Sequence, residues 1–129
     1  MAADSLDLQR LKEMTGDDPL LAAEVLILFC DQAIEWRACL DSAAVPPGWI
    51  EVCHSIKGAA VGLGALRLGE ACSIAEKLGR TYGPDAAGAE SCLDRVRDLL
   101  VVSTTEMVAL RVTLSADGRF PQTKPDRSM

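Results

Sequence analysis

The sequence predicts an all-α protein, in which an antiparallel up-down four-helix bundle follows a short extra N-terminal helix. Apolar residues recur three or four positions apart over long stretches of the 129 residues, which is the spacing of one face of a helix. Glycine and proline gather at a few places, such as residues 45–48 and 62–64, and divide these stretches. No stretch alternates polar and apolar residues between turns, so a β-sheet has little support.

A short helix is predicted over residues 5–14, where leucines and a methionine recur at helical spacing. Asp4 or Ser5 is a suitable N-cap, because a short polar side chain can accept a hydrogen bond from a free N–H group. The same stretch carries Asp4 and Asp7 ahead of any basic residue and has no apolar segment of its own. It is therefore not expected to be a secretory signal.

The second predicted helix covers residues 18–42. Asp17 or Asp18 is expected to cap it, with Pro19 in the first turn, where proline is tolerated. Residues 20–30 are apolar almost all round. This helix is therefore expected to be buried on several sides or to present apolar surface to a partner.

Three further helices are predicted over residues 48–63, 67–78 and 86–114. Residues 79–88 are expected to link the last two, because glycines stand at both ends of that stretch. The last helix would be roughly 40 Å long at the usual rise per residue, which is enough to extend along a whole bundle. Short links between four long helices favour antiparallel up-down order.

The chain is expected to form a single domain. Residues 1–115 are assigned to the helical bundle, in line with the usual size of one domain. Residues 116–129 contain two prolines among polar residues and are predicted to be a disordered C-terminal tail.

The charge balance argues against two classes of protein. The chain has 13 Lys and Arg against 19 Asp and Glu, a net charge of −6, and its isoelectric point is about 4.7. A nucleic-acid-binding module would need a basic stripe for phosphates, so none is expected. No uninterrupted apolar run reaches the 18–20 or so residues of a membrane span, so no membrane association is expected.

Metal chemistry is also not expected, because the chain has a single histidine. Its five cysteines form an odd set without a C-x-x-C pair, which argues against both a disulfide framework and a zinc site. They are interpreted as small, largely buried side chains of a protein in the reducing cytoplasm.

The one histidine, His54, falls on the outer face of the third predicted helix, opposite its apolar stripe. Lys57 lies one turn along at i+3 and Gly58 at i+4. A neutral imidazole can take a phosphoryl group from a mixed anhydride, and Lys57 could then neutralise the added charge. Gly58 weakens an exposed helix, and its missing side chain would let a partner approach His54 closely.

These residues belong to a longer motif. The run HSIKGAAVGLGA, residues 54–65, continues through Leu68, Cys72 and Glu76 and resembles the histidine-containing phosphotransfer (HPt) family. The resemblance covers about residues 5–115 and is strongest over residues 49–79.

The resemblance implies a helical bundle whose exposed histidine relays phosphoryl groups between receiver-domain aspartates in a two-component phosphorelay. Within it, His54 matches the phosphoacceptor, Lys57 the lysine that neutralises phosphate, and Gly58 the glycine that gives partners clearance. Gly64 matches the glycine that closes this helix. No further polar side chain is assigned to orient the imidazole.

The implied partners are response-regulator receiver domains and a sensor histidine kinase, which can be of the hybrid type. The protein is expected to be a monomeric, cytoplasmic phosphoryl carrier rather than an enzyme, with no cofactor or metal of its own. Magnesium would belong to the receiver domain.

Two other hypotheses remain open at this stage. A non-catalytic helical adaptor could bind and block a receiver or kinase domain, and His54 would then be incidental. A small enzyme could use a cysteine nucleophile, but consecutive helix residues such as Cys53 and His54 do not face each other.

Overall fold

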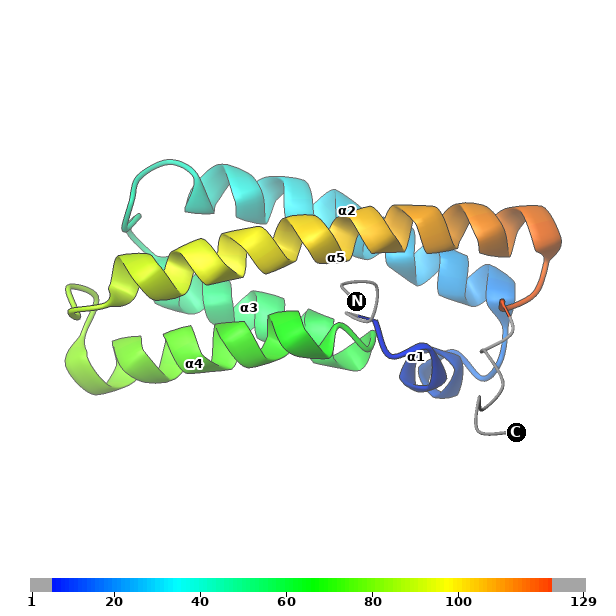
Figure 1. Cartoon of the computed structure of the whole chain (residues 1–129), viewed down its shortest axis with the longest axis horizontal. Helices are drawn as coiled ribbons and strands as arrows, with labels where there is room; N and C mark the ends of the chain where they lie inside the picture. The colour runs from blue at the N-terminus through cyan, green and yellow to red at the C-terminus, as the bar shows by residue number, and fades with distance from the viewer. Residues whose placement is uncertain (1–5, 122–129) are drawn as a thin grey trace, which may run out of the picture.

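The computed structural model describes residues 6–121, which form five α-helices and no strand. The helices are α1 (Leu8–Met14), α2 (Pro19–Leu40), α3 (Trp49–Gly62), α4 (Leu66–Tyr82) and α5 (Ala89–Asp117) (Figure 1). The predicted all-α class is confirmed.

The four long helices form an antiparallel up-down bundle, as predicted. Helix α2 packs beside α5 and α3, and α4 packs beside α3 and α5, so neighbours in sequence are neighbours in space (Figure 1). The short α1 lies across one end, where it contacts α2 and α3. Between the helices, the wholly buried side chains include Leu11, Leu26, Leu40, Trp49, Ile56, Leu68, Leu93, Leu100, Met107 and Leu114.

The N-caps of the first two helices were predicted to be short polar side chains, and the structure confirms one of the two predictions. Asp18 caps α2 by accepting hydrogen bonds from the N–H groups of Leu20 and Leu21 at 3.0 and 3.2 Å, with Pro19 next to it, as predicted. The first helix begins later than predicted, because Asp7 is its cap. Asp4 and Ser5 lie outside the described residues.

The predicted break at residue 79 was wrong, because α4 continues through Gly79 to Tyr82. Gly79 is buried and faces α3, where an added Cβ would lie 2.5 Å from Ile50 Cγ1 and 2.8 Å from Trp49 Cη2. The glycine therefore permits close packing of two helices rather than a turn.

A second glycine, Gly64, closes α3 where the resemblance predicted it. Its φ of 87° lies in the left-handed region. Its carbonyl accepts a 2.7 Å hydrogen bond from Asp7 N, and an added Cβ would lie 2.5 Å from Asp7 O. The turn between α3 and α4 is thereby held against the start of α1.

The end of α2 is held by α5. Arg97 donates from Nε and Nη2 to the Leu40 carbonyl at 3.0 and 2.7 Å, and from Nη2 to the Ala43 and Ala44 carbonyls, both at 2.9 Å. These carbonyls have no partner within the helix, so the guanidinium caps α2 and orders the link to α3.

The C-terminal part of the described chain is more ordered than predicted. Helix α5 ends at Asp117, and Phe120 packs against the core, with Lys12 Nζ 5.8 Å from its ring centroid. The start of the predicted disordered tail is therefore part of the fold. The rest of that prediction falls on residues 122–129, outside the described residues.

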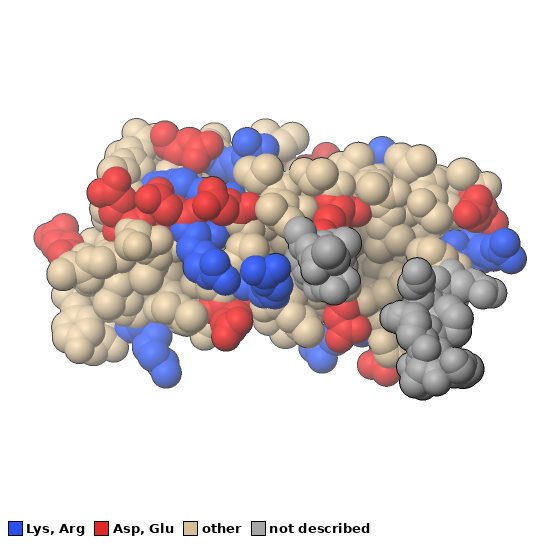
Figure 2. Space-filling view, viewed as in Figure 1, with Lys and Arg blue, Asp and Glu red and all other residues tan. Residues whose placement is uncertain are grey.

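By length and composition, α5 is also apolar enough to cross a membrane, although no uninterrupted apolar run was found in the sequence. Its buried side chains, among them Val96, Leu100 and Met107, line the bundle core. A core helix of a bundle has the same composition. On the face drawn in Figure 2, Lys and Arg side chains gather left of centre, with Asp and Glu side chains beside them.

Replacing Gly79 by alanine should lower the free energy of unfolding by about 1–3 kcal/mol, because the added methyl group overpacks the contact with Trp49 and Ile50. Gly58 is the matched control, since a Cβ there meets nothing within 4 Å. Gly58→Ala should raise the same free energy by about 1 kcal/mol through helix propensity alone. Urea unfolding of both variants tests this, and a stabilised Gly79→Ala protein would contradict it.

Candidate functional site

The candidate site is centred on His54, which projects from the outer face of α3. Its side chain is 59% exposed, while Cys53, Ile56 and Ala60 on the opposite side of the helix are buried. The predicted solvent-facing position of the histidine is therefore confirmed. The ring is not free, however, because α4 places a carboxylate against it.

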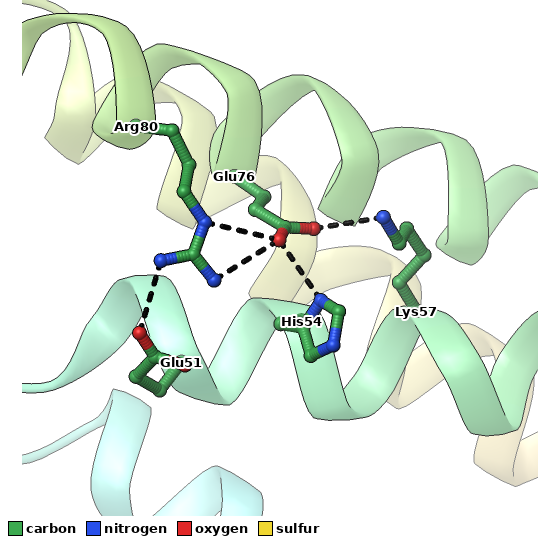
Figure 3. Close-up of polar contacts among 5 residues, drawn as sticks. All are labelled: Glu51, His54, Lys57, Glu76 and Arg80. Carbon is green, nitrogen blue, oxygen red and sulfur yellow. Dashed lines mark hydrogen bonds and ion pairs between the residues drawn. The ribbon is translucent and has the colours of Figure 1, made fainter.

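That carboxylate belongs to Glu76, which lies in the groove between α3 and α4. Glu76 Oε2 is 2.9 Å from His54 Nδ1, and the glutamate side chain is only 11% exposed (Figure 3). A buried carboxylate is costly unless it is well paired. Here the pairing is extensive, since both oxygens have a cationic neighbour.

Two cations hold Glu76 from opposite sides of His54 (Figure 3). Lys57 Nζ lies 2.8 Å from Oε1, and Arg80 donates from Nε and Nη2 to Oε2 at 3.3 and 3.2 Å. The Lys57 ammonium is the largest cause that lowers the pKa of Glu76 to about 2; His54 and Arg80 act in the same direction, and burial opposes them. Glu76 is therefore ionised at neutral pH.

The ionised carboxylate fixes which ring nitrogen of His54 carries the proton. A carboxylate can only accept a hydrogen bond, so Nδ1 must donate one. In the neutral ring the other nitrogen, Nε2, then keeps its lone pair. Figure 3 shows this second nitrogen pointing away from Glu76. The site thus presents a nucleophilic nitrogen on an exposed ring.

Lys57 and Gly58 lie where the sequence placed them, one turn along α3 from His54. Lys57 is engaged with Glu76 rather than free. Gly58 is exposed, and no atom would meet a Cβ built on it within 4 Å. The glycine therefore serves no helix packing within the described residues, unlike Gly79.

Beside Gly58 lies an apolar hollow of about 330 Å³ between α2 and α3. It includes part of the apolar stretch of α2 for which the sequence predicted either burial or contact with a partner. The hollow is lined by Met14, Val25, Leu28, Phe29, Gln32, Trp36, Gly58, Ala59, Gly62 and Leu63.

Sequence reasoning did not assign Glu76, Arg80 or Glu51 to the site. Arg80 Nη1 donates to Glu51 Oε2 at 3.0 Å, which joins α4 to the first turn of α3. One signal could have found Glu76, since it falls one turn after Cys72 at the border of the apolar stripe of α4. A charge at that position calls for a partner, and Arg80 follows at i+4.

The cysteine hypothesis receives no support from the geometry. Cys53 and Cys72 are wholly buried between α3 and α4. A hydrogen bond with Cys53 and then burial raise the pKa of Cys72, while the hydrogen bond with Cys72 lowers the pKa of Cys53. Neither sulfur is open to a substrate. The absence of a resident metal stays a prediction, although the described residues bring no three His, Cys, Asp or Glu side chains together as ligands.

Fold and site together define a helical bundle with one solvent-facing imidazole on a long helix. The resemblance of residues 54–65 implied this arrangement.

Comparison with a crystal structure supports the fold. The histidine phosphotransferase ShpA from Caulobacter crescentus is similar to this chain with a TM-score of 0.68 and 29% sequence identity, over 88% of this chain and 97% of ShpA. No family model and no curated protein matches the sequence.

The lowered pKa of Glu76 predicts how stability depends on pH. A carboxyl whose pKa is lower in the folded than in the unfolded protein stabilises the fold above the unfolded value, and this stabilisation is lost as the pH falls. The window for Glu76 runs from its ordinary value of 4.5 down to about 2.

Urea unfolding across that window should therefore show a steeper loss of stability in the wild-type protein than in Glu76→Gln, which has no proton to take up. Both proteins keep Glu51, whose pKa Arg80 also lowers, so most of the contribution of Glu51 is common to the two curves. Parallel curves would contradict the prediction.

Proposed function

We propose that this chain is a histidine phosphotransfer protein that relays a phosphoryl group between receiver-domain aspartates in a two-component phosphorelay. The observation that carries the proposal is the Glu76 carboxylate 2.9 Å from Nδ1 of an exposed imidazole, which leaves Nε2 as the free nucleophile. The similarity to ShpA supports the same role at the level of the fold.

The chemistry needs no proton transfer at the reacting nitrogen. The lone pair of His54 Nε2 attacks the phosphorus of an aspartyl phosphate, an Nε2–P bond forms, and the P–O bond to the aspartate breaks. The aspartate leaves as a carboxylate. The ring becomes a phosphoimidazolium, whose positive charge and Nδ1–H face the Glu76 carboxylate. Transfer to the next aspartate reverses these steps.

The two other predicted site residues fit this reaction. The phosphoryl group brings about two negative charges to the surface of α3. Lys57, one turn away on a flexible stem, can turn from Glu76 towards them. Gly58 leaves the surface beside His54 open for the active site of a partner.

Receiver domains and a sensor histidine kinase, including the hybrid type, are the partners that this role requires. The apolar hollow next to Gly58 offers the docking surface for them, because an aliphatic and aromatic patch beside the reacting group can bury a partner's apolar side chains. Such a protein is a phosphoryl carrier rather than an enzyme. Its expected cytoplasmic location and monomeric state remain predictions.

The adaptor hypothesis remains the alternative, since the same hollow could bind a receiver or kinase domain without transfer. What favours transfer is the polar network on His54. An incidental surface histidine has no need of a buried carboxylate held by two cations.

A phosphorylated receiver domain should label this protein on His54, and His54→Gln should remove the label without unfolding the chain. The bond should be stable to base and labile to acid, as expected for a phosphoramidate and unlike a phosphoserine. Ser55→Ala, a change at the neighbouring exposed hydroxyl, is the matched control and should keep the label. Binding of the receiver without any label would instead support the adaptor.

Gly58→Leu should slow labelling by a phosphorylated receiver domain by about tenfold or more, because misplacing the reacting atoms by about an ångström can cost about a hundredfold in rate. Labelling by phosphoramidate, a small donor, should change far less. Ala109→Leu adds similar bulk at an exposed position on α5 and should affect neither reaction. Equal losses with both donors would contradict the role of Gly58 in clearance.

A further inference from the structure

The Glu76 carboxylate has one more cation than its charge requires. Lys57 lies 2.8 Å from Oε1, while Arg80 donates twice to Oε2, the oxygen that also accepts from His54 Nδ1 (Figure 3). Either cation alone would balance the single negative charge of Glu76. The second one calls for an explanation, because side-chain ordering costs conformational entropy.

The two cations are held by unequal numbers of contacts, although the contact of Lys57 with Glu76 is the shorter one. Lys57 has an ion pair with Glu76 as its one polar contact among residues 6–121. Arg80 makes two hydrogen bonds to Glu76 and a third, at 3.0 Å, to Glu51 on α3. Its planar guanidinium spans two carboxylates with donors in a fixed geometry, whereas a lysine ammonium has no such rigid fork. Lys57 can therefore leave Glu76 more readily than Arg80 can.

A phosphoryl group on Nε2 would act differently on the two cations. Its charge attracts the nearest readily released cation, which is Lys57, and Glu76 then loses the contact that lowers its pKa most. The cationic ring then still donates Nδ1–H to Glu76, and a carboxylate that is 11% exposed needs a further cation if it is not to take that proton. Arg80 is already bound to it.

We propose that Arg80 is a positioning residue, which keeps the Glu76 carboxylate on His54 Nδ1 after Lys57 has turned to the phosphoryl group. This inference rests on the proposed function. Glu51 forms an ion pair with the other side of the guanidinium and thereby holds Arg80 beside Glu76. With Arg80 in place, the ring keeps its Nδ1 proton throughout. When the Nε2–P bond breaks during onward transfer, the electron pair returns to Nε2 and the ring leaves as a neutral imidazole.

The test compares Arg80→Gln, Arg80→Lys and Lys57→Gln with the wild-type protein, and Arg95→Gln removes an exposed charge on α5 as a matched control. Each full-length chain is studied before and after labelling with phosphoramidate. Nitrogen-15 NMR of the imidazole reports the Nδ1-bound proton. The rate of onward transfer to an isolated receiver domain is measured on the labelled proteins.

Arg80→Gln should keep the Nδ1–H signal before labelling, when Lys57 still holds Glu76, and lose it afterwards, because the Glu76 carboxylate without a cation beside it takes the proton from Nδ1. Its onward transfer should slow by about tenfold, the cost of one charge-assisted hydrogen bond. Arg80→Lys should recover part of this loss. Lys57→Gln and Arg95→Gln should keep the signal in both states, because Arg80 remains on Glu76.

Loss of the signal from Arg80→Gln before labelling would overturn the proposal, because Arg80 would then merely build the resting site. Retention of the signal in both states would overturn it as well, and the proposed function would stand. A wild-type chain that takes no label on His54 would overturn the proposed function and this inference together.

Discussion

The site depends on how closely α3 and α4 approach each other. Small side chains line their contact, with Cys53 and Cys72 side by side and Gly79 under Ile50 and Trp49. A second glycine, Gly69, lies under Val61, where an added Cβ would be 2.7 Å from Cγ2. Because the helices are antiparallel and this close, a glutamate on one reaches a histidine on the other. The close contact of α3 and α4 also explains why cysteines stand at positions 53 and 72, since they act there as small apolar side chains.

Charge compensation is the second requirement, because the close approach buries the carboxylate that it brings to His54. The desolvation that raises the pKa of Glu76 is outweighed by Lys57, His54 and Arg80 together. The order of importance is informative. The largest effect comes from Lys57, whose charge the proposed reaction would draw towards the phosphoryl group. Under the proposed function, the resting and the phosphorylated states would therefore depend on different cations.

The bundle could be predicted from the sequence because periodicity is a local property, and the exposed position of His54 follows from one helix alone. Gly79 was misread because its role is contact with Ile50 on another helix, which no local pattern encodes. Glu76 stood in the motif without a role, and its contact with His54, like the contribution of Arg80, was missed for the same reason. They lie 22 and 26 residues beyond His54, and only the packing of α4 on α3 brings them to the ring. The position of Lys57 was predicted from its spacing to His54, but its ion pair with Glu76 could not be predicted in this way.

All of the polar side chains around His54 stand on two core helices, so the described structure offers no moving part that would separate an entry side from an exit side. One nitrogen of the imidazole points away from Glu76 (Figure 3), and Gly58, one turn along α3, lines the hollow. Under the proposed function, donor and acceptor must therefore use the same surface in turn, and each excludes the other while it is bound. The kinetics would be of the ping-pong type, and an excess of either partner would inhibit the relay by occupying the carrier.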